Sequence, residues 1–430
     1  MGVLDADSRI IALGFARLVD SIGNSFLIIV LPLYISGGLV TGETFGLAPV
    51  FITGIVLSAF GFFNSGLQPF VGNLSDRLGR RQVFVVLGLL VLGVSNFAYS
   101  LVHTYGAVLV VRLGQGLGVA LTIPTTVALV NELSRETARG ESMGLFNTFR
   151  MVGFGLGPVI AGGVVSGGPY RLAGTSVSGF DAAFYVAASG ALLGALLVAV
   201  LVSDPETPAS GAGADDQRLS IAVLDRNGPH VLDPVFTLGV ASVFMAVSIS
   251  LIEPLEHQIN TALDQTATLF GIEFSAFILA QIFFQTPIGS WSDAYGRKPF
   301  ILGGLVVLAP ATLAQAFVST PVGMVLARFV QGIAGAAILA PSMALAGDLA
   351  GARSSGTTLS VLTMAFGLGI AFGPLLGGAL ADIPLPWGQP YAAPFVFGTA
   401  LVFVGFGLVA TQVEETVDAD RPWPWWGASE

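Results

Sequence analysis

Charged side chains inside long apolar runs are the residues of this sequence that could do chemistry. Asp20, Arg112, Arg150 and Arg328 all fall within such runs. A charge in apolar surroundings is costly and is usually paired or faces a polar cavity, so each one marks a candidate functional site. A carboxyl in such a place can take up or release a proton when its neighbours move, and a guanidinium can bind a carboxylate or a phosphate. The expected chemistry is therefore reversible binding of protons and ions.

Asp20 is the best candidate for a proton carrier. It lies about ten residues into the first apolar run and shares a helical face with Asn24. Two interpretations stay open. The carboxyl could couple to a proton or a substrate, or it could form a structural pair with Arg17, one helical turn earlier.

Arg150 lies beside Asn147 in an apolar run that holds no acid to neutralise it. An anionic substrate would supply the missing charge in a site near the middle of a membrane. The alternative is that the side chain reaches Asp20 and completes an internal network.

Two polar pairs recur in corresponding runs. Asn64 and Gln68 in one run match Gln281 and Gln285 in another. These four side chains could line a cavity, and hydrogen bonding between helices explains them equally well.

The elements that must position these residues are membrane-spanning helices. Of the 430 residues, 53% are hydrophobic and 10% are charged, whereas soluble domains carry roughly 25% charged residues. A spanning helix needs about 20 mostly apolar residues. The sequence predicts twelve such runs: Ile10–Ile35, Ala48–Val71, Val83–Leu101, Ala107–Leu129, Ser142–Val165, Ala182–Val202, Val235–Leu255, Leu269–Trp291, Phe300–Val318, Val322–Ala346, Thr357–Ala381 and Pro394–Val413.

The runs form two sets of six. We expect an N-terminal six-helix bundle at 1–203, a linker rich in Pro, Gly and charge at 204–233, a C-terminal six-helix bundle at 234–413 and a tail at 414–430. Basic residues in short loops stay on the cytoplasmic side. With the N-terminus inside, Arg171 is the loop arginine left outside, so both termini and the linker are expected to be cytoplasmic.

The two sets repeat each other at a nearly constant separation. The segment Gly72-Asn-Leu-Ser-Asp76-Arg77-Leu-Gly79-Arg80-Arg81 recurs as Gly289-Ser-Trp-Ser-Asp293-Ala-Tyr-Gly296-Arg297-Lys298. Likewise Arg112-Leu-Gly-Gln115-Gly116 recurs as Arg328-Phe-Val-Gln331-Gly332, and Gly157-Pro158 recurs as Gly373-Pro374. The chain therefore contains an internal duplication.

These motifs resemble those of the major facilitator superfamily. The loop from Gly72 to Arg81 is similar to its signature loop between the second and third helices, with a degenerate copy in the second half. Arg112-x-x-Gln115-Gly116 resembles its fourth-helix motif. The resemblance, which covers about Ile10 to Val413, implies a pseudo-symmetric fold of twelve transmembrane helices and secondary transport by alternating access.

A further motif resembles that of the proton-coupled drug exporters of the superfamily. Gly153-x-x-x-Gly157-Pro158 is similar to their fifth-helix motif, which bends a helix and lets neighbours pack closely. The exporter pattern ends Gly-Pro-x-x-Gly-Gly, and this segment has one extra residue, while Gly373-Pro374 begins a stricter copy. The resemblance implies export in exchange for protons, with Arg112 as the partner of Asp20. Arg112 could instead be a fixed charge bonded to Gln115 and carbonyls, and Arg328, with no acid in view, favours a structural role.

The signature loop has a physical task of its own. Asp76 can cap a neighbouring helix, and Arg80 can bridge Asp76 to Glu132 at the end of the fourth run. Asp293, Arg297 and Asp348 repeat this triad. We expect these residues to latch the two halves together on the cytoplasmic side and so to bias a two-state equilibrium, the alternative being a solvated basic loop that only sets the topology. Arg77, Gly79 and Arg81 complete the predicted loop motif.

Several classes of function are not supported. The chain has no Cys and 3 His, so a metal centre is not expected, and no cofactor is implied. No Gly-x-x-x-x-Gly-Lys-[Ser/Thr] loop indicates nucleotide hydrolysis, and neither an intramembrane enzyme site nor a receptor's ligand domain is evident. Glu253, Glu256 and Glu273 are expected as solvated rim residues, with a cation or proton entry site as the alternative.

The expected partners are a small-molecule substrate, a proton or a sodium ion, and the lipid bilayer of the cell membrane. Nucleic acid is not expected to bind a chain of net charge −10, and the oligomeric state expected is a monomer. The acidic, Lys-poor composition suggests a high-salt cytoplasm. Uptake of an organic anion or a sugar with protons or sodium is the alternative to export.

Overall fold

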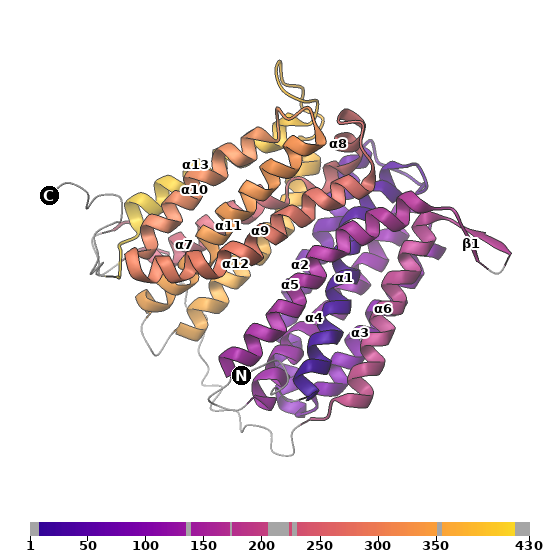
Figure 1. Ribbon diagram of the computed structural model, residues 1–430, viewed down its shortest axis with the longest axis horizontal. Helices are drawn as coiled ribbons and strands as arrows, with labels where there is room; N and C mark the ends of the chain where they lie inside the picture. Colours follow the sequence, from indigo (N-terminus) through magenta and orange to yellow (C-terminus); the bar gives the residue numbers. More distant parts are fainter. Residues whose placement is uncertain are drawn as a thin grey trace. The chain divides into compact units, whose positions relative to one another are not determined.

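The structure is almost entirely helical. The computed structural model describes residues 8–134, 139–172, 174–204, 223–225, 230–350 and 355–417. Within these residues, twelve helical segments are long and apolar enough to cross a membrane. The predicted all-α membrane fold with twelve spans is confirmed, and one short β-hairpin, which the sequence did not indicate, projects from it (Figure 1).

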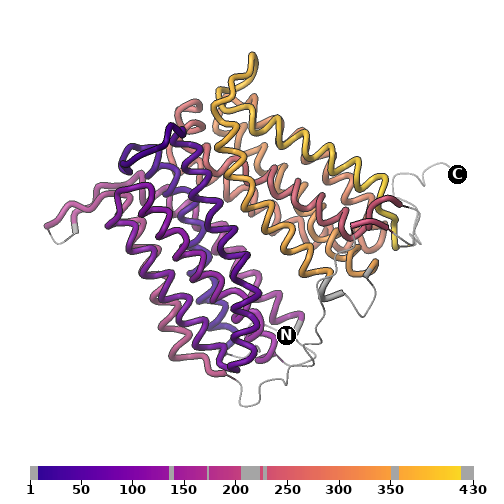
Figure 2. The backbone as a smooth tube through the Cα atoms, turned by 180° about the vertical axis from the view of Figure 1, so that it is seen from behind, coloured from indigo at the N-terminus to yellow at the C-terminus, as the bar shows by residue number. Residues whose placement is uncertain are grey.

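The chain divides into two compact units, residues 1–216 with 259–275, and residues 217–258 with 276–430. The first unit contains α1 (Ser8–Ser36), α2 (Pro49–Leu78), α3 (Arg81–Ala98) extended by η2 (Tyr99–Leu101), α4 (Tyr105–Leu133), α5 (Arg139–Gly167), the strands β1 (Tyr170–Leu172) and β2 (Thr175–Val177), and α6 (Gly179–Leu201). These helices run side by side in both views of the backbone (Figures 1 and 2).

The second unit begins with a span in three pieces. These are α7 (Pro234–Ser250), η4 (Glu253–Leu255) and α8 (Glu256–Ala262), and they are followed by α9 (Ala267–Tyr295), α10 (Arg297–Ala314), α11 (Pro321–Ala350), α12 (Ser355–Leu380) and α13 (Ala392–Gln412). The break falls at Pro254, which has no N–H to continue an α-helix. Residues 259–275, the end of α8 and the start of α9, pack with the first unit.

The same helix pairs are in contact in each unit. In the first unit α1 packs on α5 and α6, and α3 packs on α4 and α6. In the second unit α7 packs on α12 and α13, and α10 packs on α11 and α13. The duplication read from the motifs is therefore a duplication of packing.

Polar side chains form N-caps at the starts of α6 and α7. The Asp233 carboxylate accepts hydrogen bonds from the backbone N–H groups of Val235 and Phe236 at 2.9 and 3.0 Å, and the Ser178 hydroxyl accepts one from the N–H of Asp181. Such N-caps satisfy donors that have no partner inside the helix. They help to fix where α7 and α6 start.

The predicted boundaries of the bundles, 1–203 and 234–413, stay predictions. Most of the predicted linker, 204–233, and most of the tail, 414–430, lie outside the described residues.

Candidate functional site

Asp20 lies in α1 and is almost fully buried. Its side chain forms an ion pair with Arg17 on the same helix, with 2.5 Å between Asp20 Oδ2 and Arg17 Nη1. The relative exposure of Asp20 is 4%. The structure thus shows the predicted pair of Asp20 with Arg17, and the coupling role of Asp20 stays a prediction.

Two glycines of α5 bring a second arginine to this pair. A Cβ on Gly153 would collide with the backbone of Leu18, and one on Gly157 would collide with the Ser25 side chain. Because these glycines have no side chains, α5 packs closely on α1. Arg150 lies between Phe149, which packs on Gly14, and Gly153, which packs on Leu18, and is therefore at the level of Arg17 in α1.

Arg150 has a hydrogen-bond partner on its own helix. Its Nε donates a hydrogen bond to Asn147 Oδ1 at 2.9 Å. In the part of the chain that the structure describes, no acidic side chain forms an ion pair with Arg150. Arg17, Asp20 and Arg150, which we call the α1–α5 charge cluster, therefore carry one positive charge in excess when Asp20 is ionised.

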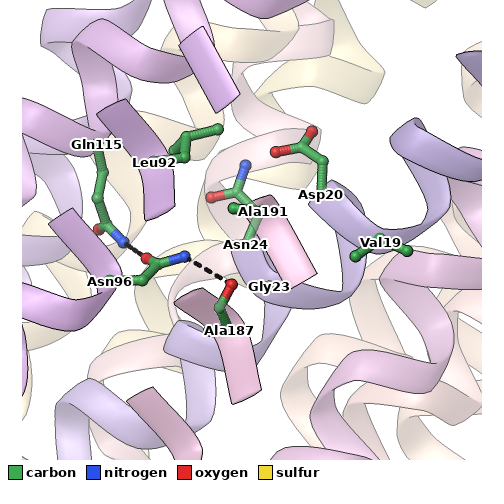
Figure 3. A pocket seen from close by; sticks show the side chains of 9 residues that line it. All are labelled: Val19, Asp20, Gly23, Asn24, Leu92, Asn96, Gln115, Ala187 and Ala191. Carbon is green, nitrogen blue, oxygen red and sulfur yellow. Dashed lines mark hydrogen bonds between the residues drawn. The ribbon is translucent and has the colours of Figure 1, made fainter. Parts of the chain in front are cut away.

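A small polar cavity adjoins Asp20. It is bounded by α1, α3, α4 and α6, and its polar lining consists of Asp20, Asn24, Asn96 and Gln115 (Figure 3). Gln115 Nε2 donates to Asn96 Oδ1, and Asn96 Nδ2 donates to the carbonyl of Ala187. These bonds fix the amides, whereas Asn24 lies beside Asp20 as the shared helical face predicts.

Arg112 forms a network on α4. Its Nη1 donates to Gln115 Oε1 at 2.9 Å, and Tyr99 donates its hydroxyl proton to the same oxygen at 2.9 Å. The guanidinium carbon lies 4.4 Å from the centre of the Phe60 ring, a cation–π contact. Arg112 thus bonds Gln115, which borders the cavity, and its predicted role as the partner of Asp20 stays a prediction.

The second unit repeats this network. Arg328 Nη1 donates to Gln331 Oε1 at 2.5 Å, and Gln331 Nε2 donates to the Thr312 hydroxyl at 3.1 Å. The Arg328 guanidinium lies 4.8 Å from the Phe277 ring centre. Arg328 also donates to the carbonyl of Ile249, in agreement with a structural role.

The loop between α2 and α3 forms a latch whose residues all lie within the first unit, so the expectation that this latch joins the two halves is wrong. Arg81 bridges Asp76 and Glu132, with N–O distances of 2.7 and 2.6 Å. The prediction that Arg80 makes this bridge is wrong. Gly79 ends α2 with a left-handed φ of 61°. Arg80 then occupies the N-cap position of α3 with its side chain exposed, and Arg81 is the first residue of the helix and bonds Asp76 and Glu132.

The other residues of this loop have simpler positions. Arg77 is exposed on the last turn of α2. Gly72 lies against the Pro124 side chain of α4.

The second unit has the corresponding latch. Arg297 contacts Asp293 at 3.0 Å and also bonds Asp348 at the end of α11. Asp348 accepts a further hydrogen bond from the Thr416 hydroxyl at 2.9 Å. The chain that follows α13 thus joins the latch.

A second repeated contact escaped the sequence analysis, and we call it the carboxylate clasp. In the first unit the backbone N–H of Gln82 donates to Asp204 Oδ1 at 2.8 Å, and the Gln82 side chain donates to carbonyls in the last turn of α6. In the second unit the N–H of Lys298 donates to Glu415 Oε2 at 2.8 Å, and Lys298 Nζ donates to the Ala410 carbonyl. A signal was available: each acid falls just after the last helix of its half.

The remaining predicted residues lie as follows. Asn64 Oδ1 accepts a hydrogen bond from Gln68 within α2, whereas Gln281 and Gln285 are half-buried in α9. That these four line a cavity stays a prediction. Pro158 and Pro374 lie inside the continuous helices α5 and α12.

Three acids differ from expectation. Glu253, Glu256 and Glu273 are 8%, 0% and 1% exposed. The expectation that they are solvated rim residues is wrong, because all three side chains are buried.

A family model describes both halves. The model for the Major Facilitator Superfamily matches residues 13–252 and 236–424. The chain belongs to the Major Facilitator Superfamily.

Relatives agree with this assignment. The chain is 24% identical over 386 residues to the quinolone resistance protein NorA of Staphylococcus aureus, covering 88% of this chain and 91% of NorA. It is 30% identical over 149 residues to an uncharacterized MFS-type transporter of Methanocaldococcus jannaschii, covering 35% of this chain and 39% of that protein.

Solved structures share the fold. A bacterial homolog of the human lysosomal transporter Spinster superposes with a TM-score of 0.75 at 15% identity, covering 93% of this chain and 95% of that one. The nucleoside transporter NupG gives 0.68 at 15% identity, covering 94% and 99%. The human organic anion transporter MFSD10 gives 0.62 at 18% identity, covering 93% and 98%.

Membership of the superfamily has direct consequences. The protein is a multi-pass membrane transporter of small molecules and not an enzyme. Its helices supply the membrane-spanning scaffold that the composition requires.

Proposed function

We propose that this transporter exports a small organic compound across the cell membrane in exchange for protons. The observation that carries the proposal is Asp20, a carboxyl buried in a spanning helix beside a polar cavity and paired with a single arginine of its own helix. A buried acid whose partner can move away is suited to binding a proton in one state and releasing it in another. The similarity to a quinolone resistance protein supports export of a drug-like compound or a metabolite.

Asp20 is the proposed proton carrier, and Arg17 is the partner that it exchanges for the proton. When Asp20 is ionised, the Arg17 ion pair balances its charge. When the carboxyl is protonated, that attraction is lost, and Arg17 is free to interact elsewhere. Arg112 is proposed to shape the cavity through Gln115 and not to carry the proton.

The two latches are the proposed elements of alternating access. Each one joins a loop at a helix start to the end of a neighbouring helix by an arginine between two acids. A difference of a few kcal/mol in such contacts between two states is enough to shift their populations strongly. The proposed orientation places both latches, both termini and the linker on the cytoplasmic side.

A second candidate function is uptake of an organic anion together with protons or sodium. The observation that favours it is Arg150, which has no acidic partner among the described residues. An anion at Arg150 and a proton at Asp20 would attract each other, so they would bind and move together. The two candidates thus predict opposite directions of proton movement.

Proteoliposomes containing the purified protein test both. For export by exchange, an acidic lumen drives the cargo inward, because protons leave as the cargo enters; for joint transport, an acidic bath does so. A screen would cover drug-like cations, organic acids, zwitterions and sugars. Asp20→Asn is expected to abolish the effect of the pH gradient, whereas Glu43→Gln, an exposed acid, keeps it. Undiminished gradient-driven transport by Asp20→Asn would remove Asp20 from the coupling role.

A further inference from the structure

The duplicated halves allow shared scaffold to be separated from added chemistry. The helix pairs α1–α5 and α7–α12 pack by the same device, a glycine of one helix against the backbone or a serine of the other. The matching contacts are Gly153 with Leu18 and Gly157 with Ser25 in the first half, and Gly369 with Val243 and Gly373 with Ser250 in the second. These contacts fix which residues occupy equivalent positions.

At this register the charge cluster exists in one half alone. The positions of Arg17, Asp20 and Arg150 are occupied in the second half by Ser242, Met245 and Phe366. The scaffold packs without the three charges there, with Met245 fully buried. The charges are therefore not needed for packing two helices in this way.

The Arg112 network behaves in the opposite manner. Both halves have the arginine, the glutamine one turn later and the aromatic ring beneath the guanidinium. Because this network is present in both halves, the architecture that the halves share explains it. The charge cluster is explained by a task that only the first half performs.

The composition of the cluster indicates the ligand. Two guanidinium groups and one carboxylate lie together in the middle of spanning helices, and an uncompensated charge there is costly. A carboxylate or phosphate between Arg17 and Arg150 would balance the excess and accept paired N–H donors from them. The cargo therefore needs an anionic group at this position.

The proposed exchange with protons adds a second requirement. A proton and a cargo that move in opposite directions must exclude each other, and a purely anionic cargo would attract the proton instead. A basic group that binds Asp20 does exclude the proton. We propose that the cargo is a zwitterion, with its anionic group on Arg150 and Arg17 and its protonated amine on Asp20; this inference rests on the proposed function.

Few other charges surround Asp20. On its own helix it faces Arg17 and Asn24. The elements packed around it contribute Arg150 from α5, by way of Arg17, and the uncharged lining of the cavity: Leu92, Asn96, Gln115, Ala187 and Ala191. Arg112 bonds Gln115 behind that lining. A ligand amine would therefore compete at Asp20 with Arg17 and a proton.

The exchange balances in charge and protons. The amine enters as its ammonium ion and forms an ion pair with the Asp20 carboxylate. Arg17 then leaves Asp20 and binds the anionic group of the cargo beside Arg150. When the zwitterion leaves on the outer side, one proton from that side binds the carboxylate to give the neutral acid. On the inner side this acid releases its proton, and the Arg17 pair seen in the structure re-forms.

Three forms of one compound test the inference. The probes are 4-(aminomethyl)benzoate, its methyl ester, which is only a cation, and its N-acetyl derivative, which is only an anion. Binding to the purified full-length protein is measured by calorimetry at neutral pH, and proton release on binding is measured in weakly buffered solution at a pH low enough to protonate Asp20 beforehand. Arg171→Gln, an exposed arginine on β1, is the control.

The expected pattern separates the two ends of the ligand. Arg150→Gln weakens binding of the zwitterion and of the N-acetyl form by about tenfold to a hundredfold, which is the range for losing a charged hydrogen bond. It leaves the affinity for the ester unchanged. Arg150→Lys restores part of the loss, which shows that the fold is intact. Asp20→Asn weakens the zwitterion and the ester and abolishes proton release, but it spares the N-acetyl form.

Other outcomes overturn the inference in distinguishable ways. If Arg150→Gln leaves zwitterion binding unchanged while exchange through Asp20 persists, the cargo site is wrong and the proposed export stands. If Arg150 is needed but the N-acetyl anion binds without an amine and its binding makes the protein take up protons, the assignment of a zwitterionic cargo is wrong. Export in exchange for protons is then wrong as well. Failure of the protein to prefer the zwitterion over both single-charge forms, including no binding of any form, overturns the inference directly.

Discussion

Arg81 Nη2 lies 2.6 Å from Glu132 Oε1, which ties the start of α3 to the end of α4. The same guanidinium also reaches Asp76, so one arginine holds two helix ends. Glu132 is the more sheltered acid, with a side-chain exposure of 11% against 63% for Asp76. The bond to Glu132 is therefore expected to contribute more to this latch, because exposed pairs are weakened by solvent.

We predict that Glu132→Gln shifts the balance between the two transport states by about fivefold to thirtyfold, as loss of 1–2 kcal/mol would do. The chain contains no Cys, so spin labels can be attached to cysteines introduced at exposed positions such as Leu78 and Trp291. Pulsed electron paramagnetic resonance then reports the populations. Glu43→Gln serves as the control, and Asp76→Asn is expected to have a smaller effect. Equal populations in Glu132→Gln and the parent would contradict the latch.

Loss of either carboxylate clasp should lower stability by a similar amount. Asp204→Ala and Glu415→Ala each remove a charged acceptor from a backbone N–H near a helix start, a change that costs about 0.5–2 kcal/mol. Thermal unfolding in detergent measures the loss. Because the clasps belong to different units, the double variant should show the sum of the two losses. A single variant that already gives the full loss would mean that the clasps are not independent.

Substitution of the buried Arg112 or Arg328 should lower stability and leave proton coupling unchanged. Arg112→Gln and Arg328→Gln each remove a guanidinium that is bonded to a glutamine and stacked on an aromatic ring. We expect each to lower the unfolding free energy by about 1–3 kcal/mol. The ratio of protons to cargo moved should stay that of the parent in both. A changed ratio in Arg112→Gln would return Arg112 to the coupling role.

Close packing of α1 on α5 gives a test with a strong contrast. A side chain at Gly153 would meet the backbone of Leu18, whereas Gly144, nine residues earlier on the same helix, faces open space. We predict that Gly153→Leu lowers stability by about 1–3 kcal/mol or more through overpacking, and that Gly144→Leu does not. Unfolding temperature and the yield of monodisperse protein measure the difference. Similar values for both variants would contradict the packing that places Arg150 beside Arg17.

The spans and the duplication were open to prediction because they depend on patterns that repeat along the chain. Apolar runs of sufficient length define α1 to α13 without any knowledge of contacts. The pairing of Asp20 was open to prediction as two alternatives, since Arg17 lies one turn away in any helix.

Details of the site depended on backbone geometry that composition does not reveal. The left-handed turn at Gly79 decides that Arg81 and not Arg80 faces Glu132, a change of one residue. Glu253 and Glu256 flank the break at Pro254 and are buried, and their residue types alone do not reveal this. Asp204 and Glu415 have different flanking sequences. Only the structure shows that each acid accepts a hydrogen bond from a backbone N–H at the start of the third helix of its half.

The carboxylate clasp has a consequence for the origin of the molecule. Because each half closes its own last helix onto the start of its third helix, the bond was part of the unit that was duplicated. An ancestral protein of one half would then have carried such an acid just beyond its final helix, bonded to the start of its third helix. Joining two copies then required only that the gene continue past this acid, and the joining segment was free to diverge in length and composition from that point onward.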